Sequence, residues 1–326
     1  MGKIDRAEFI DGSVVGDSPP IRRVKALIKL VAEHPGATAL ITGETGSGKS
    51  LAAKVIHHAS ENSAEPFMEV NCSAIPPTLL ESQLFGHKKG AFTGATDKSV
   101  GMAEKAGKGT LFLDEIGELP LELQAKLLTL VERRRFIPVG DTRERKMEAR
   151  LITASNRDLS DLVAEGKFRK DLFYRLNVLM IEAPPLRNIG DDLFKLAKIF
   201  LDVFNRKYGK ELTGFSSGAR ELLGEHDWPG NARELRNVVE RATVLASEGE
   251  LTEEHIVIQS VEGGGERKRK AERFSLPEEG VSLEEVEKRL IREALERADG
   301  NQSEAARLLG LSRETLRYRA NKYDLS

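Results

Sequence analysis

The chain has 326 residues, a length that suits two or three domains. Hydrophobic residues make up 40% of it and charged residues 31%, as expected for a globular protein with a substantial core. The net charge of −2 excludes a uniformly basic nucleic-acid coat, so any DNA binding must come from a local basic patch.

Cys72 is the single cysteine, so the chain cannot form an intrachain disulfide and a reducing compartment is expected. We interpret Cys72 as a small buried residue. No run of 18 apolar residues is present, and the N-terminus lacks the apolar core of a signal peptide. The sequence therefore predicts a cytoplasmic protein that does not cross a membrane.

Five apolar runs typical of β-strands lie between about residue 20 and residue 185, separated by helix-like segments. These runs are "TALIT", "PFMEV", "TLFLD", "ARLITAS" and "VLMIEA". Such alternation is typical of a parallel sheet with helices on its faces. We therefore predict an α/β domain over residues 1–185.

The segment "GETGSGKS" follows the first run and precedes the helix-like "LAAKVIHHA". It matches the phosphate-loop pattern in its strand–loop–helix context, which disfavours a glycine-rich turn with a chance lysine. Lys49 is expected to reach the β- and γ-phosphates and Ser50 to bind Mg²⁺, at the positive end of the following helix. The predicted nucleotide-binding residues are Gly43, Glu44, Thr45, Gly46, Ser47, Gly48, Lys49, Ser50 and Leu51.

The stretch "GHKKGAFTGATDKS", residues 86–99, carries one aromatic residue, Phe92, among small residues and glycines. Neither helical nor strand periodicity surrounds Phe92, so we predict a flexible loop. An exposed aromatic side chain is usually a liability, which favours a partner-binding role. The alternative is a Phe92 side chain that folds back beneath its own loop.

Two carboxylates follow the apolar run of "GTLFLDEI". Acidic residues at the end of a buried strand are costly unless they have a function, so solvated acids are the less favoured interpretation. We expect Asp114 to hold Mg²⁺ and Glu115 to orient and polarise the attacking water. Together with the phosphate loop, this pair predicts an NTPase.

Further polar residues follow along the chain. Asn156 ends the strand-like "ITASN", where its amide could contact the water or the γ-phosphate, although a plain turn residue fits equally well. Arg169 and Arg175 lie in "FRKDLFYRL", and their spacing alone assigns them no role.

Residues 186–260 contain no strand-like run and predict a small helical domain. The composition of residues 261–280 predicts a linker.

Residues 281–326 predict a helix-turn-helix domain. Ser282 and Glu285 form a capping box, and Gly300 suits a helix C-terminus. Two short helices, "SEAARLLG" and "SRETLRYRANKY", then meet at "GLS". The apolar face of the first helix comprises Leu283, Val286, Leu290, Ile291, Ala294 and Leu295.

The last helix carries a local basic patch. Its four cations (Arg313, Arg317, Arg319 and Lys322) accompany one acid, Glu314. A solvated helix face is the alternative, which the preceding turn disfavours. The predicted DNA-binding residues are Ser312, Arg313, Thr315, Arg317, Tyr318 and Arg319.

Residues from about 10 to 258 resemble the AAA+ domain of bacterial enhancer-binding proteins, the activators of sigma-54 RNA polymerase. The most specific motif is "GAFTGA", and "VNCSA", "ESQLFGH", "PPLR" and "WPGNARELRN" support it. The terminal "DGNQSEAARLLGLSRETLRYRANKY" resembles a Fis-type helix-turn-helix. The resemblance covers nearly the whole chain, and it implies an α/β AAA+ ATPase subdomain, a helical lid, a linker and a DNA-binding domain.

The resemblance also implies roles. It makes Asn71 a switch that pairs with Glu115, Arg169 and Arg175 arginine fingers that reach a neighbouring subunit's γ-phosphate, and Arg233 the sensor II arginine. The implied sigma-54 contacts are Gly90, Ala91, Phe92, Thr93, Gly94 and Ala95. ATP and Mg²⁺ are the implied cofactors. The implied protein is a ring, a hexamer when active and a dimer when inactive, that binds enhancer DNA and converts the closed polymerase complex into an open one.

Some features depart from the family pattern. Ser50 stands where many members have an acid, and Gln83 replaces the usual glutamate; neither change threatens ATP use. Members usually carry an N-terminal sensory domain, such as the receiver of a two-component system. The phosphate loop begins at Gly43, too early for a receiver of roughly a hundred residues. Control by a separate partner, constant activity and truncation all stay open.

Two other classes of function fit the sequence less well. A regulator that uses ATP only as an assembly ligand is disfavoured by the intact Asp114–Glu115 pair. An AAA+ unfoldase or helicase loader is disfavoured by "GAFTGA" and the Fis-type end.

Overall fold

The computed structural model describes residues 6–92, 96–258, 282–298 and 300–323. The chain divides into two compact units, Met1–Gln259 and Ser260–Ser326, which are described separately. The predicted linker, Thr93, Gly94 and Ala95 lie outside the described residues. Within the described parts, no helix combines the length and the apolar character needed to cross a bilayer.

A five-stranded parallel sheet forms the centre of the first unit, with strand order β2-β5-β8-β1-β9. All five predicted apolar runs supply one strand each. Their bounds are Ala39–Thr42 (β1), Phe67–Asn71 (β2), Thr110–Asp114 (β5), Arg150–Ser155 (β8) and Leu179–Glu182 (β9). In the ladder between β2 and β5, Asn71 lies opposite Asp114. Polar residues that end neighbouring strands therefore meet at one edge of the sheet.

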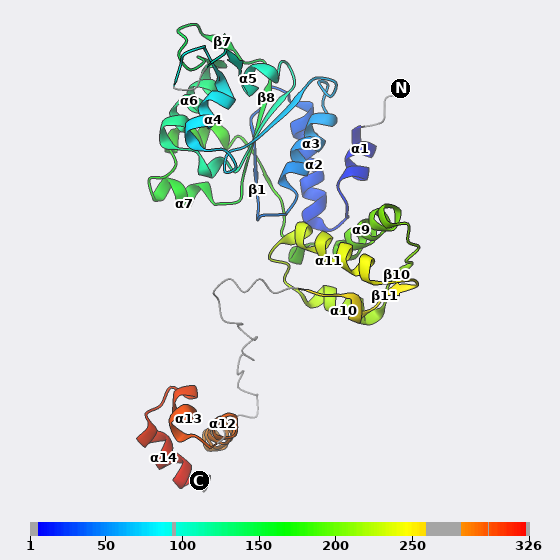
Figure 1. The fold of residues 1–326 in the computed structure, drawn as a ribbon, viewed down its shortest axis with the longest axis vertical. Helices are drawn as coiled ribbons and strands as arrows, with labels where there is room; N and C mark the ends of the chain where they lie inside the picture. The colour runs from blue at the N-terminus through cyan, green and yellow to red at the C-terminus, as the bar shows by residue number, and fades with distance from the viewer. Residues whose placement is uncertain (1–5, 93–95, 259–281, 299, 324–326) are drawn as a thin grey trace. The chain divides into compact units, whose positions relative to one another are not determined.

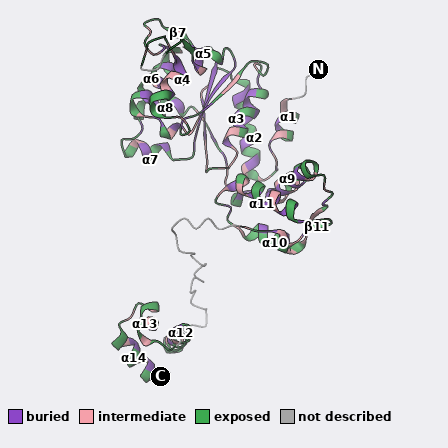
Figure 2. Cartoon of the chain, viewed as in Figure 1, coloured by how far each residue is buried: buried purple, intermediate pink, exposed green. Residues whose placement is uncertain are grey.

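Helices cover both faces of the sheet, as Figure 1 shows. Strand residues alternate between the faces: Phe112 packs with the helices on one face, whereas Leu111 and Leu113 pack with those on the other. Figure 2 shows both layers of buried residues. The helices of this part are α1 (Arg6–Ser13), α2 (Pro19–Glu33), α3 (Lys49–His58), α4 (Pro77–Phe85), α5 (Met102–Lys105), η1 (Ile116–Glu118), α6 (Leu121–Arg133), α7 (Leu159–Ala164) and α8 (Lys170–Leu176).

Two short antiparallel pairs lie apart from the main sheet. β3 (Gly86–His87) pairs with β4 (Ser99–Val100), so it closes the base of the loop that carries Phe92. β6 (Arg135–Phe136) pairs with β7 (Arg145–Lys146) to form a hairpin.

A mainly helical lid follows the sheet. Its elements are η2 (Leu186–Asn188), α9 (Asp192–Tyr208), β10 (Gly214–Phe215), α10 (Ser217–Glu225), α11 (Asn231–Leu245), β11 (Glu250–Leu251) and η3 (Glu253–His255). β10 and β11 form a parallel pair where the sequence predicted no strand. Two residues are too few to produce a recognisable apolar alternation, so the sequence could not reveal this pair.

The second unit contains α12 (Leu283–Arg297), α13 (Gln302–Leu308) and α14 (Arg313–Lys322), as predicted for a helix-turn-helix. Ser282 caps α12 by accepting the Glu285 N–H at 3.4 Å. Ile291 and Ala294 of the predicted apolar face are buried in its core, whereas Leu290 of the same face is 45% exposed. The three helices bury a small core, which covers only part of the apolar face of α12.

We predict that Phe112→Ala lowers the free energy of unfolding by about 3–5 kcal/mol, because a fully buried ring is lost from the centre of the sheet. Urea unfolding followed by tryptophan fluorescence measures the change. Leu121→Ala is the matched control, since Leu121 is 49% exposed. Equal losses for the two variants would contradict this assignment of the core.

Candidate functional site

The loop between β1 and α3 has the backbone of a phosphate-binding loop. Gly43, Gly46 and Gly48 all have positive φ, which favours glycine. A Cβ on Gly43 would lie 2.6 Å from the Ala183 carbonyl oxygen, and one on Gly46 would lie 2.3 Å from that of Gly230. The glycines are therefore required by both conformation and space, and the loop leads directly into the N-terminus of α3.

Lys49 is held inside this loop. Its Nζ donates hydrogen bonds to the carbonyl oxygens of Gly43, at 2.9 Å, and Glu44, at 3.1 Å. Burial lowers the pKa of Lys49, while the charges of Glu115 and Asp114 oppose that shift. The ammonium group is thus positioned by main-chain acceptors, with a third donor left to reach an anion.

The two residues predicted to hold Mg²⁺ lie in contact. Ser50 Oγ donates to Asp114 Oδ2 at 3.1 Å, and the Glu115 N–H donates to Asp114 Oδ1 at 2.9 Å. Hydroxyl and carboxylate oxygens are the ligands that Mg²⁺ prefers. The donor set at the end of β5 therefore fits this ion.

Glu115 combines three unusual features. Its backbone is left-handed, with φ 54° and ψ 47°, although it is not a glycine. Its Oε2 is buried and accepts no hydrogen bond from the described residues. Burial raises the pKa of Glu115, and the nearby charge of Lys49 opposes the shift. Strain and a buried carboxylate oxygen without a partner are typical of a functional residue.

A polar cavity of about 210 Å³ joins these groups. It is lined by Thr45, Gly46, Gly48, Lys49, Ser50, Leu51, Asp114, Glu115 and Arg233. Two cations and two carboxylates thus line the same cavity. Lys49 and Arg233 suit phosphate oxygens, and Asp114 and Glu115 suit a cation and a water molecule.

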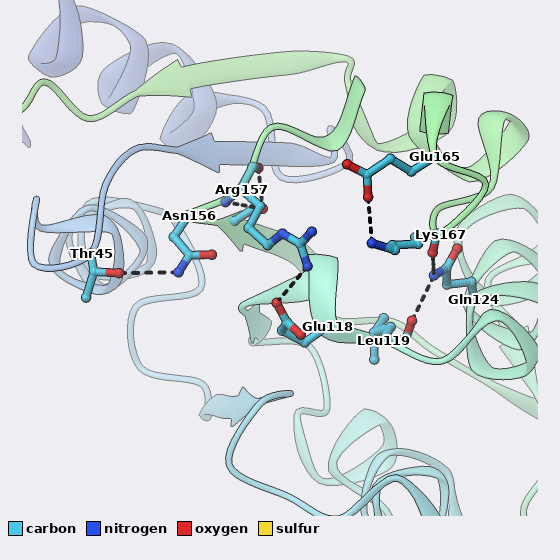
Figure 3. A network of polar contacts seen from close by, with 9 residues as sticks. Thr45, Glu118, Leu119, Gln124, Asn156, Arg157, Glu165 and Lys167 are labelled. Atoms are coloured by element: carbon cyan, nitrogen blue, oxygen red, sulfur yellow. Dashed lines mark hydrogen bonds and ion pairs between the residues drawn. The ribbon is translucent and has the colours of Figure 1, made fainter. Parts of the chain in front are cut away.

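Asn156 lies beside the phosphate loop, as Figure 3 shows. Its Nδ2 donates to Thr45 Oγ1 at 3.3 Å.

Gln124 lies in the same view (Figure 3), where its Nε2 donates to the carbonyls of Leu119, at 2.8 Å, and Lys167, at 3.0 Å. Gln124 Oε1 also accepts the Arg169 N–H at 2.8 Å, which connects α6 to the start of α8.

Asn71 does not make its predicted contact with Glu115 in this structure. Its Oδ1 accepts the N–H and the hydroxyl of Ser73, at 2.9 and 2.8 Å, and the Ala74 N–H at 3.2 Å. Asparagine readily satisfies its own turn in this way. The Asn71 side chain is thus occupied locally, while Glu115 Oε2 lacks a partner among the residues that the structure describes. The role of Asn71 as a switch stays a prediction.

Neither predicted arginine finger lines the cavity of its own chain. Arg169 precedes α8 as its N-cap residue and pairs with both oxygens of Asp171, at 3.0 and 2.6 Å. Arg175 is exposed near Arg134, and it forms no ion pair within the described part of the chain. The surface of α8 therefore presents Arg175 outward.

The base of the loop carrying Phe92 is fastened to the β6–β7 hairpin. Lys88 Nζ lies 2.7 Å from the carboxylate of Asp141, whose side chain is 2% exposed. The hydrogen bond from Lys88 lowers the pKa of Asp141 to about 2. The sequence reasoning missed Asp141, since no spacing rule relates it to Lys88.

Phe92 itself is 38% exposed. Its ring centroid lies 5.0 Å from that of His87, in an edge-on arrangement. The described part of the loop therefore leaves Phe92 partly available, supported on one side by His87.

The basic face of α14 is smaller than predicted. Arg319 pairs with Glu287, and Lys322 lies 3.5 Å from Glu284, so acids of α12 offset two of the four cations. Arg313, Arg317 and Tyr318 are exposed, whereas Ser312 and Thr315 bond to each other at the start of the helix. The exposed trio forms the candidate nucleic-acid surface.

Three protein families match consecutive parts of the chain. The sigma-54 interaction domain matches residues 14–182, the AAA+ ATPase lid domain residues 187–273, and the bacterial regulatory proteins of the Fis family residues 282–323.

Known regulators match over nearly the whole chain. The phenol regulator MopR of Acinetobacter guillouiae is 43% identical over 96% of this chain, and the regulatory protein AtoC of Escherichia coli is 44% identical over 96%. The chain spans 56% of MopR and 68% of AtoC. The crystal structure of NtrX from Brucella abortus in complex with ATP has a TM-score of 0.70 and 30% identity, and the match covers 97% of this chain and 70% of that one.

We predict that Glu115→Gln raises the free energy of unfolding of the nucleotide-free protein by about 1 kcal/mol, because it removes a poorly compensated buried charge. The pKa of Glu115 is higher in the folded protein than in the unfolded chain, so folding favours the protonated side chain. The free energy of unfolding of the wild-type protein therefore falls as pH rises through the folded-state pKa, where Glu115 becomes ionised. The advantage of the variant should therefore grow with pH. Thermal unfolding over a pH series measures it.

Glu118→Gln is the matched control, because Glu118 is exposed and paired with Arg157 at 3.3 Å. It should not stabilise the protein. A Glu115→Gln variant that is less stable than wild type at every pH would contradict the burial of an uncompensated charge.

Proposed function

The chain belongs to the family of sigma-54-dependent transcriptional regulators, with an AAA+ ATPase domain and a Fis-type helix-turn-helix. We propose that it hydrolyses ATP to open promoters that are bound by sigma-54 RNA polymerase. One observation carries the proposal: Glu115, whose buried Oε2 has no partner among the described residues, lines the same cavity as Lys49 and the Ser50–Asp114 pair. That arrangement combines phosphate binding with activation of water.

In the proposed reaction, Lys49, Arg233 and the N–H groups of the phosphate loop bind the phosphates of ATP. Ser50 and Asp114 would hold Mg²⁺, which supplies charge neutralisation. Glu115 holds the attacking water through its free oxygen and accepts a proton from it. The raised pKa of Glu115 makes its carboxylate a stronger base than an exposed glutamate, which supports this role. Asn156 positions the same end of the loop through Thr45.

The proposed enzyme is a ring, with each site completed by a neighbour. Arg169 and Arg175 would reach the γ-phosphate bound by the adjacent subunit. Two features support this part of the proposal: Arg175 is exposed and does not line its own cavity, and it has no ion pair within the described residues. A hexameric active form and a dimeric inactive form follow from the family resemblance.

Outside the catalytic site, the GAFTGA loop would contact sigma-54 and α14 would bind enhancer DNA. The partial exposure of Phe92 supports the first contact. The outward Arg313, Arg317 and Tyr318 support the second, with the arginines on phosphates or base edges. The DNA-binding unit would thus keep the ATPase near the promoter, and ATP hydrolysis would act on the polymerase through the GAFTGA loop.

Arg175→Ala should nearly abolish ATP hydrolysis and leave ATP binding measurable, because the arginine acts on a neighbour's nucleotide. Lys49→Ala should be inactive as well, through loss of its own site. Mixed at equal concentration, the two inactive proteins should regain part of the wild-type rate, since some junctions pair an intact Lys49 with an intact Arg175. Phosphate release measures the rate.

The mixing experiment has a simple control: each variant mixed with itself at the same total concentration. A fully active Arg175→Ala protein would refute the shared site, and so would a mixture no more active than its two components.

Phe92→Ala should hydrolyse ATP at close to the wild-type rate, because Phe92 lies outside the phosphate-binding and water-activating groups. It should fail to open a promoter bound by sigma-54 polymerase. Hydrolysis and open-complex formation are measured side by side, with Leu121→Ala as an exposed-residue control. Normal promoter opening by Phe92→Ala would reject the loop as the contact surface.

A further inference from the structure

Glu44 is an unexpected residue for a loop that binds phosphates. It is the second residue of the phosphate loop, and a carboxylate close to bound phosphates is electrostatically unfavourable. In the structure its charge is directed toward the lid. Arg187 Nη1 donates to Glu44 Oε2 at 2.9 Å, and Arg187 Nη2 pairs with the other oxygen. The pair is bidentate, the geometry in which arginine binds carboxylate most specifically.

Asn231 adds a second connection at the same place. Its Nδ2 donates to Glu44 Oε2 at 3.0 Å and to the Thr45 carbonyl at 3.1 Å, while its Oδ1 accepts the Leu186 N–H at 2.8 Å. The residue is fully buried and has a left-handed backbone, with φ 51°. Every polar group of this amide is therefore committed.

The next residue of the loop is held from the same turn. The Ala232 N–H donates to the Gly46 carbonyl at 3.1 Å. Three consecutive loop residues, Glu44, Thr45 and Gly46, thus bond to the start of α11 or to η2. The turn before α11 is itself anchored by Trp228, which is fully buried and accepts the Asn231 N–H at 2.8 Å through its carbonyl.

We propose that Arg187 and Asn231 form a latch on Glu44 that fixes the phosphate loop to the lid, so that nucleotide affinity and lid position depend on each other. The inference rests on the proposed ATPase function, which it deepens. Arg187 does not line the nucleotide cavity, so it is a positioning residue. It holds the loop in place and pairs with the carboxylate of Glu44, which would otherwise repel the phosphates. Asn231 is the rigid part of the latch, and Arg187 is its half-exposed part.

The hydrogen bonds from Arg187, and after them those from Asn231, lower the pKa of Glu44 to about 2. Glu44 is therefore ionised at any physiological pH, and its charge must be balanced whenever ATP binds. Loss of Arg187 leaves that charge uncompensated beside the phosphates. Loss of both Arg187 and the charge of Glu44 removes the repulsion as well as the latch.

A double-mutant comparison tests the latch. Arg187→Ala should weaken binding of a fluorescent ATP analogue about tenfold and raise KM for ATP by a similar factor, with a smaller change in kcat. The double variant Glu44→Gln/Arg187→Ala should bind the analogue more tightly than Arg187→Ala alone. Arg187→Lys, which keeps the charge but loses the bidentate geometry, should lie between wild type and Arg187→Ala.

Lys198→Ala is the matched control on the lid, because Lys198 forms a similarly exposed pair with Asp202 at 3.0 Å. It should bind the analogue as the wild type does. Unchanged affinity in Arg187→Ala, or a double variant no better than that single variant, would overturn the latch. A wild-type protein that neither binds nor hydrolyses ATP would instead refute the proposed function itself.

Trp228 supplies a second readout, since it is the only tryptophan of the chain. ATP should change the tryptophan emission of the wild type and of Lys198→Ala. At ATP concentrations that saturate each protein, the change should be smaller in Arg187→Ala, because one of the connections between the loop and the lid is lost while those from Asn231 and Ala232 remain. Equal changes in all three proteins would contradict the coupling.

Discussion

The nucleotide site depends on one constraint: the Glu115 carboxylate, at the end of β5, has a buried oxygen that no described residue satisfies. Such a group costs free energy, and here the backbone of Glu115 is also left-handed. The surrounding residues make the cost tolerable. Lys49 supplies an opposite charge, Asp114 is satisfied by Ser50 and by the main chain, and the strand that ends at Asp114 is held in the centre of the sheet.

Two ion pairs connect motif-bearing loops to other parts of the first unit. Glu44 and Arg187 join the phosphate loop to the lid. Lys88 and the nearly buried Asp141 join the base of the Phe92 loop to the β6–β7 hairpin. In the first pair, Glu44 belongs to "GETGSGKS" and Arg187 to "PPLR". In the second pair, Lys88 lies between "ESQLFGH" and "GAFTGA", and Asp141 lies in the hairpin. Contacts between residues far apart in the sequence thus fix the phosphate loop to the lid and the base of the Phe92 loop to the hairpin.

Local sequence was sufficient for the features that local physics determines. Apolar runs predicted all five sheet strands, and the spacing from Gly43 to Ser50 predicted the phosphate loop. Contacts between distant residues could not be predicted, because no periodicity relates Lys88 to Asp141 or Arg319 to Glu287. The turn made by Asn71 shows a further limit. The resemblance implied a switch role for Asn71, but the hydrogen bonds of its side chain in this structure are made with Ser73 and Ala74. The finger role of Arg175 stays a prediction, because it concerns a neighbouring subunit.

The central claim is that hydrolysis at the Glu115 site opens promoter DNA. Its most direct test is strand separation in a duplex promoter bound by sigma-54 polymerase, followed with a fluorescent base at the start site. Wild-type protein should produce the signal with ATP and not with a non-hydrolysable ATP analogue that binds equally well. Strand separation of equal extent with the analogue would contradict the claim, since binding without hydrolysis would then be enough.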